Sequence, residues 1–158
     1  MLPNGFLCIY GSDHAIACAD ERVGDQVKIA YVVIDPVTGE GMSGNAGHLP
    51  PLLLSQDSRP RLDTTTAGTP LGWASPRKQY AFRLQKGNTA VWYSDGLVES
   101  RDRGLDTGLD ELVMVAGQAS PEVIAHPDRL LQYLVDRMLA GHEQDDDVTV
   151  LVLQVPQE

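Results

Sequence analysis

The sequence predicts an α+β fold with mostly antiparallel strands. Apolar runs typical of strands occupy the chain as far as Asp95, amphipathic helical patterns follow, and one more apolar run, Val148 to Val155, closes the pattern. Strands, then helices, then a strand that must rejoin a sheet differ from the alternating order of a βαβ protein. The 158 residues fit one domain with a core of its own.

The charge composition limits the kinds of molecule that the protein is expected to bind. The formal net charge is −10 and the sequence pI is about 4.7, which argues against nucleic acid or an anionic membrane and is compatible with cation binding. No apolar run approaches the ~20 residues of a membrane span, and the N-terminus lacks the basic and apolar regions of a signal peptide. With Cys8 and Cys18 interpreted as reduced thiols, we expect a cytoplasmic protein.

The first part of the chain is predicted to contain strands and one short helix. Phe6 to Tyr10 suggests a short strand, and Ser12 or Asp13 suits the cap of a short helix through Ala19. The first well-defined strand runs from Val27 to Asp35. Its apolar run occupies both faces, which is typical of a strand covered on both sides.

Turn signals separate the strands that follow. Asp35-Pro36-Val37-Thr38-Gly39-Glu40 predicts a hairpin whose second strand runs from Gly41 to Asn45. Leu49 to Leu54 is extended, because its two prolines exclude a helix. Arg61 to Thr66 is predicted to be another short strand, ahead of a glycine-rich loop.

Two helical patterns follow Asp95. The first ends at Gly117, and the second is opened by Ser120 as a cap with Pro121 at its first position. Pro127 interrupts the second pattern, and the main helix then continues to Gly141. The apolar positions are Leu109, Leu112, Val113 and Ala116 in the first helix, and Leu130, Leu131, Leu134, Val135 and Met138 in the main helix.

Two strands carry carboxylates at their ends. Ala90 to Asp95 is expected to form a hairpin with Gln79 to Leu84 and ends on Asp95, directly before Gly96. Asp146 stands at the start of the last strand. If the strands are neighbours, both carboxylates lie at one rim, where hard oxygen ligands suit Mg²⁺ or Mn²⁺. From spacing alone, a solvated acidic loop and a plain turn explain the pattern equally well.

Other polar residues give less specific signals. His48 suits an indirect metal-site or substrate contact, and equally a hydrogen-bonded structural role. The remaining histidines are expected at the surface, and the arginines suit a phosphate but are individually more often solvated. These are His14, His126 and His142, and Arg59, Arg61, Arg101 and Arg103. Asp102, Asp106 and Asp110 lack calcium-loop spacing and indicate a polar loop leading into a helix.

Five segments occur in an order that resembles a known family. Together they are similar to the stage II sporulation protein E type of metal-dependent serine/threonine phosphatase (PPM, type 2C). The match covers about Val27 to Val155, and five motifs in order are much more specific than any one alone. The segments are Ile34 to Glu40, Asn45 to Leu53, Thr69 to Gly72, Tyr93 to Arg101 and Asp145 to Leu151.

The resemblance implies two antiparallel sheets with helices outside and two Mn²⁺ or Mg²⁺ ions at one rim. A water bridging the metals would attack phosphoserine or phosphothreonine directly. Asp95 and Asp146 match the family's metal-binding aspartates, and Gly96 is a weaker metal candidate. Asn45, His48 and Asp147 are candidates for indirect metal-site or substrate contacts. The implied partner is a phosphorylated anti-anti-sigma-type protein.

The chain departs from the family at its N-terminal side. The Asp-x-x-Gly-His-Gly segment, whose Asp bridges both metals, is not found. We therefore expect residues 1–158 to form one partial phosphatase domain with a divergent segment 1–24 and one metal or none. The alternative function is a catalytically impaired remnant that acts as a regulatory binding module. Missing strands would leave a sheet uncovered, which favours a homodimer.

Overall fold

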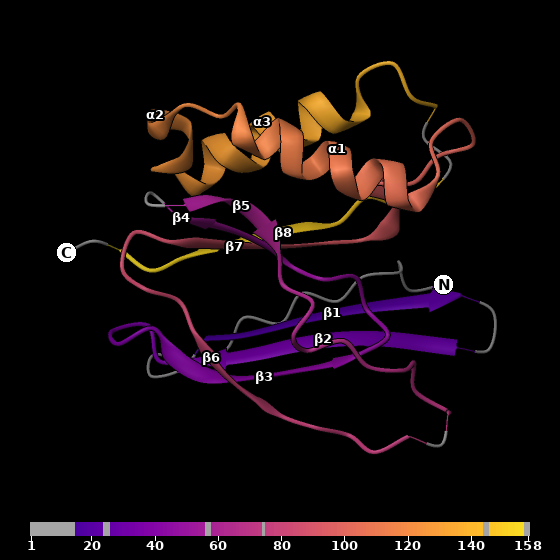
Figure 1. The fold of residues 1–158 in the computed structure, drawn as a ribbon, viewed down its shortest axis with the longest axis vertical. Coiled ribbons are helices and arrows are strands. Elements are labelled where there is room, and N and C mark those ends of the chain that lie inside the picture. Colours follow the sequence, from indigo (N-terminus) through magenta and orange to yellow (C-terminus); the bar gives the residue numbers. More distant parts are fainter. Residues whose placement is uncertain (1–14, 24–25, 56–57, 74, 144–145, 157–158) are drawn as a thin grey trace.

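The structure is a computed structural model that describes residues 15–23, 26–55, 58–73, 75–143 and 146–156. Two four-stranded antiparallel sheets stack on each other, and a layer of helices covers one of them (Figure 1). In the first sheet the order is β1-β2-β3-β6, and in the second it is β5-β4-β7-β8. The predicted α+β class with mostly antiparallel pairing is confirmed.

The first sheet begins with a strand where a helix was predicted. β1 (Ala15–Val23) pairs along its whole length with β2 (Gln26–Ile34), so the predicted helix through Ala19 is wrong. Its capping residues, like the strand predicted at Phe6 to Tyr10, lie outside the described residues. Local helix signals are a weak prior, and backbone pairing with a long neighbouring strand overrides them.

The predicted hairpin after β2 is confirmed. The amide of Asp35 donates to Glu40 and the amide of Gly39 donates to Asp35, while a carboxylate oxygen of Asp35 accepts from Val37 and Thr38. β3 (Glu40–Ala46) then pairs with β2. An aspartate that accepts amides two and three residues on stabilises such a turn.

The second sheet is formed by strands from distant parts of the sequence. β4 (Leu52–Ser55) pairs with both β5 (Ser58–Leu62) and β7 (Thr89–Tyr93). β8 (Val150–Gln154) lies on the other side of β7. β5 begins and ends earlier than the strand predicted over Arg61 to Thr66. Just after its end, Asp63 accepts from the amide and hydroxyl of Thr65, and the chain turns there.

The hairpin predicted between Gln79–Leu84 and Ala90–Asp95 is wrong. β6 (Tyr80–Arg83) pairs with β3 in the first sheet, so the turn at residues 86–88 carries the chain from one sheet to the other. The ring of Phe82 packs across the sandwich on Trp92, with 6.1 Å between centroids. An alternating pattern is compatible with a hairpin between the two strands and also with a place for each strand in a different sheet. Alternation alone therefore does not predict which of the two arrangements forms.

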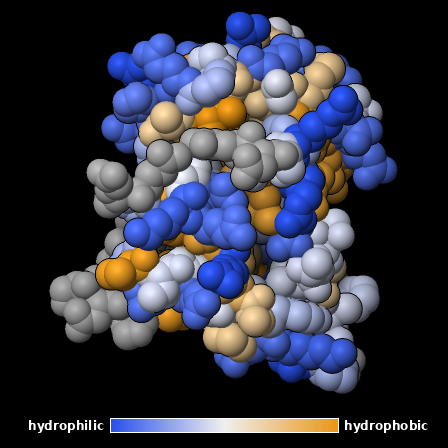
Figure 2. Space-filling model, turned by 60° about the vertical axis from the view of Figure 1, so that its left-hand side comes forward, coloured by the Kyte–Doolittle hydropathy of each residue, from blue (hydrophilic) through white to orange (hydrophobic). Residues whose placement is uncertain are grey.

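The helices follow the predicted boundaries closely. The 3₁₀ turn η1 (Asp95–Leu97) precedes α1 (Leu105–Gly117), α2 (Pro121–Ile124) and α3 (Pro127–Leu139). The Ser120 hydroxyl accepts the amide of Val123, as a capping residue does. Gly141 follows α3 with a φ of 81°, a left-handed conformation that glycine adopts without strain. The outer surface of this layer is mostly hydrophilic (Figure 2).

Two hydrophobic cores lie on the two sides of β7, all of whose residues are buried. Val91 and Tyr93 point toward the helices, and Ala90 and Trp92 point between the sheets. This alternation follows from the period of two along a strand. β7 is therefore the central strand of the molecule, and the residues directly after it are held by both layers.

Candidate metal-binding site

The chain turns sharply where β7 ends, and Asp95 lies in that turn. The amides of Val98 and Glu99 donate to the Asp95 carbonyl and close the turn. Ser94 ties it to the C-terminal strand: its amide donates to the Thr149 carbonyl, and its hydroxyl accepts from the Thr149 amide and donates to the Asp147 carbonyl, each at 2.9 Å. The position of Asp95 therefore depends on the segment that carries Asp146 and Asp147.

Gly96 brings these two segments into direct contact. A Cβ at Gly96 would stand 2.7 Å from the Asp147 carbonyl oxygen and 3.1 Å from that of Asp146. Real Cβ atoms do not approach backbone that closely, so a larger residue would push the segments apart. The carboxylate of Asp146 accepts its neighbour's amide at 2.8 Å. The expected proximity of the Asp95 turn and the Asp146–Asp147 segment is thus present in the fold.

Lys28 lies across the rim from this turn. Its Nζ is 3.9 Å from Oδ2 of Asp95, and the two side chains are 22% and 17% exposed. Lys28 belongs to β2 of the first sheet, whereas Asp95 follows β7 of the second. The ion pair therefore joins the two sheets at the rim.

Asn45 and His48 form a tight turn beside the rim. The Asn45 side chain accepts from the His48 amide at 2.9 Å and donates to the His48 carbonyl at 3.0 Å. His48 Nδ1 donates to the carbonyl of Leu49 at 3.0 Å, since a carbonyl can only accept. Burial lowers the pKa of His48, and the smaller effects are those of the hydrogen bond to Leu49, which raises it, of Lys28, which lowers it, and of Asp95, which raises it. His48 is therefore buried and neutral at pH 7.

Oxygen atoms from two segments lie close together at this rim. Asp95 lies in the turn after β7, and carbonyl oxygens of Asp146 and Asp147 lie against Gly96. Mg²⁺ and Mn²⁺ prefer such ligands. Within the part of the chain that the structure describes, no group of three or more His, Cys, Asp or Glu side chains converges as a metal cluster does. Asp95 and Asp146 are therefore candidates for metal ligands by their place at this rim.

Several other polar residues have structural roles. Arg103 was expected to be solvated, but it is 4% exposed and donates to Glu111, to the Met138 carbonyl and to the Leu97 carbonyl. It therefore connects the Asp95 turn to both long helices. His142, expected at the surface, lies 3.1 Å from Asp102.

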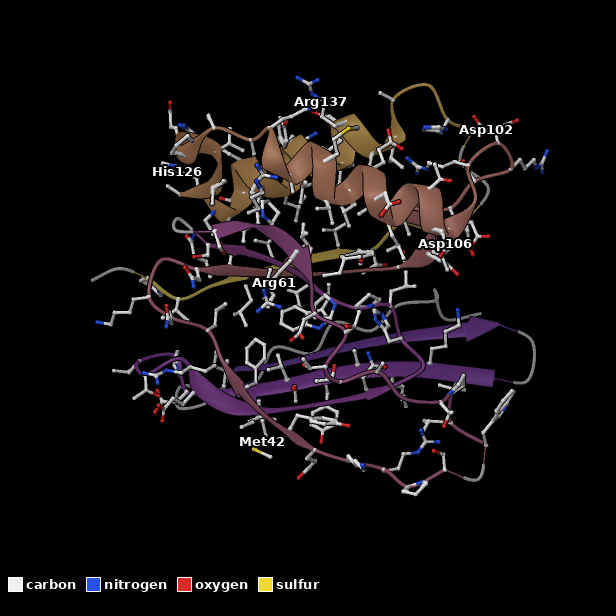
Figure 3. All side chains as sticks on the ribbon, viewed as in Figure 1. Met42, Arg61, Asp102, Asp106, His126 and Arg137 are labelled. Atoms are coloured by element: carbon white, nitrogen blue, oxygen red, sulfur yellow. The ribbon has the colours of Figure 1, made fainter. Side chains whose placement is uncertain are left out.

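The remaining candidates are exposed or lie outside the described residues. Arg59, Arg61, Arg101 and His126 are exposed, as expected, and His14 lies outside the described residues. Figure 3 shows Asp102 and Asp106 near the loop before α1, and His126 and Arg137 on the helical layer.

Two residues of the rim were missed by sequence reasoning. Ser94 carries no signal beyond its place beside Asp95. Lys28 does carry one, because it is a charge in an alternating row with Ala30, Val32 and Ile34, which are buried between the sheets. A charged residue in such a row indicates a partner at the rim.

Several solved structures share this architecture. The structure of the RsbU and RsbW domains of Rv1364c from Mycobacterium tuberculosis superposes with a TM-score of 0.81 at 21% identity, covering 98% of this chain and 57% of that one. RsbX in complex with magnesium gives 0.67 at 10% identity, covering 96% and 87%. The PP2C domain and regulatory fragment of SpoIIE from Bacillus subtilis gives 0.57 at 20%, covering 82% and 38%.

These likenesses show the fold, which the chain shares with the PP2C phosphatase domain of SpoIIE. The model of the stage II sporulation protein E family matches residues 14–156, and the chain therefore belongs to that family. The chain spans about half the length of the Rv1364c structure and over a third of the SpoIIE structure. Among the described residues, no helix is long and apolar enough to cross a membrane.

Proposed function

We propose that the chain is a metal-dependent protein phosphatase domain that removes phosphate from phosphoserine or phosphothreonine of an anti-anti-sigma-type regulator in the cytoplasm. One observation carries the proposal: Gly96 packs the Asp95 turn directly on the backbone of Asp146 and Asp147. Family membership supports the reaction class. The similarity to RsbU and RsbX domains supports a place in partner switching. We also propose that residues 1–158 act as one domain.

The chain's own residues have distinct roles in this proposal. Asp95 and Asp146 would hold Mn²⁺ or Mg²⁺, with Gly96 allowing backbone oxygens to approach. A bound cation of this kind lowers the pKa of a coordinated water and balances charge on phosphoryl oxygens. Asn45 shapes the turn that buries His48 next to the rim. The neutral imidazole adds no positive charge beside the cation.

Calorimetric titration with Mn²⁺ tests the proposal, alongside turnover of an aryl phosphate and of a phosphorylated anti-anti-sigma-type protein. We expect the wild-type chain to bind Mn²⁺ and Asp95→Asn to lose both binding and metal-dependent turnover. Asp110→Asn is the matched control, because it removes the same charge from an exposed position on α1. Equal binding by wild type and Asp95→Asn would contradict the proposed site.

A second function is favoured by the contact between Lys28 and Asp95. Because an ammonium group already partners this carboxylate, the domain can hold its rim together without a metal. In that case the chain is a catalytically impaired module that binds a regulator. Tight binding of a phosphorylated or unphosphorylated anti-anti-sigma-type protein, without turnover at millimolar Mn²⁺, would select this function over the first.

We further propose that two copies of the chain associate through the outer face of the β1-β2-β3-β6 sheet. Met42 on this face and the nearby Leu71 are 40% and 37% exposed. Figure 3 shows Met42 pointing away from the sandwich. Covering these side chains would remove apolar surface from water.

A further inference from the structure

Lys28 occupies a position of β2 where the fold otherwise buries apolar side chains. Ala30, Val32 and Ile34 alternate with it and are 4%, 0% and 1% exposed between the two sheets. Lys28 continues this row to the rim, where 22% of its side chain reaches solvent. An ammonium group in such a place is unfavourable unless an opposite charge meets it.

Asp95 meets that charge from the other sheet. The 3.9 Å between Nζ and Oδ2 puts the ammonium group beside the carboxylate that is the leading candidate for a cation ligand. β2 places Lys28 there through two backbone contacts: it pairs with β1 on one side, and Ile29 bridges to Gly47 on the other. Gly47 belongs to the turn that ends with buried His48, and the pKa of His48 is affected by the charges of both Lys28 and Asp95.

We propose that Lys28 is an internal counter-ion that competes with a divalent cation for Asp95 and so sets the metal concentration at which the rim is loaded. The inference rests on the proposed function, since it takes Asp95 as a cation ligand. A cation bound to Asp95 would stand within a few ångströms of the ammonium group, and like charges at that separation repel. Loading therefore requires Lys28 to leave its partner.

The chemistry of the pair explains why a lysine suits this role. Its charge sits at the end of a flexible four-carbon chain and can move to solvent without a change in the backbone. A half-buried carboxylate without a counter-charge is unfavourable, and the Lys28 ammonium group supplies that counter-charge to Asp95 when no metal is present. The rim thus has two alternatives, one closed by Lys28 and one closed by a metal ion.

Calorimetric titration of the whole chain with Mn²⁺ tests this inference. In Lys28→Met the competing charge is gone and the stem length is kept, so we expect binding about tenfold tighter than in wild type. Lys28→Arg keeps the charge and should stay within about twofold of wild type. Lys86→Met is the matched control, because it changes net charge equally at the opposite end of β7.

A second measurement uses stability and needs no activity. A ligand that binds the folded state raises the melting temperature more when its affinity is higher. Mn²⁺ should therefore raise the melting temperature of Lys28→Met more than that of wild type at the same concentration. If Lys28→Met is not folded by circular dichroism, Lys28→Gln provides the same comparison with a polar side chain at the rim.

The outcomes separate this inference from the proposed function. Equal Mn²⁺ affinity in wild type and Lys28→Met, with binding lost in Asp95→Asn, overturns the role of Lys28 and leaves the proposed site in place. Equal tightening in Lys86→Met also overturns it, because net charge then explains the effect. Binding in Lys28→Met but not in wild type supports the inference and contradicts metal-dependent activity of the unmodified chain. No binding in any variant overturns both.

Discussion

The two sheets of the sandwich have the same number of strands but differ in what covers them. α1 and α3 pack on the β5-β4-β7-β8 sheet, and Leu112, Leu130, Leu134 and Met138 are completely buried there (Figure 1). In the described part of the chain, no helix lies over the outer face of the β1-β2-β3-β6 sheet. The described helices therefore cover only one of the two sheets, and the outer face of the other is partly exposed.

The central strands of the two sheets show what this difference means for sequence patterns. Both strands contain a continuous apolar run, Ile29 to Ile34 in β2 and Ala90 to Tyr93 in β7, and the run in β2 was predicted to be covered on both sides. All of β7 is buried, but in β2 Ile29, Tyr31 and Val33 are only half-buried. A continuous apolar run thus indicates a strand whose two faces are both suited to burial. It does not tell whether another element of the chain covers each face.

The largest effect is expected on the covered side. Leu134→Ala removes a fully buried side chain from α3, and should lower the free energy of unfolding by about 2–5 kcal/mol because the rigid surroundings leave a cavity. Urea denaturation measures it. Arg137→Ala, at an exposed position of the same helix, should cost less than about 1 kcal/mol. Similar losses in both variants would contradict the dominance of core packing on this side of the molecule.

A smaller loss is expected between the sheets. Phe82→Leu keeps an apolar side chain but removes the ring that packs on Trp92, and should cost about 1–2 kcal/mol. Tryptophan fluorescence during urea denaturation reports both the loss and the change around Trp92. The neighbouring Ala81→Ser, on the exposed outer face, is the control. A loss as large as that of Leu134→Ala would show that the inter-sheet core is equally important.

His48 predicts how stability changes with pH. Its pKa is lowered in the folded state. As pH falls through about 6.5, His48 therefore binds a proton in the unfolded chain but not yet in the folded chain. The contribution of neutral His48 to the free energy of unfolding is fully present above about pH 6.5, and it is lost as pH falls toward the lowered pKa of the folded state. Melting temperatures measured from pH 7.5 downward should fall less steeply in His48→Gln. An identical slope in both proteins would exclude His48 as the cause.

The smallest effect on unfolding is expected on the uncovered face. Met42→Glu places a charge where the side chain is 40% exposed, and should change the free energy of unfolding of the single chain by less than about 0.5 kcal/mol. Sedimentation velocity should nevertheless show wild type associating as concentration rises and Met42→Glu remaining monomeric. A monomeric wild type at all concentrations would contradict the proposed dimer and leave this face open.

Local sequence determined the turns, the helices and the position of each carboxylate along the chain. The hairpin at Asp35, the cap at Ser120 and the end of α3 before Gly141 all follow from hydrogen bonds or conformations of residues within a few positions. Such interactions are complete within the segment, so its residues are sufficient to predict them. Likewise, Asp95 could be placed just after a strand because the apolar run ends there, whereas β8 begins at Val150, later than the strand predicted from Val148.

Tertiary structure alone decided which strands became neighbours and which charges met. The alternation in β6 fits a hairpin with β7 or a place in the other sheet, and pairing with β3 settled it. The helical signal before Ala19 yielded to pairing with β2. Lys28 and Asp95 are distant in sequence and belong to different sheets. Their contact depends on how the two sheets stack. The alternation of side chains along a strand tells on which side of the sheet a residue lies, but not which residue of the other sheet it meets.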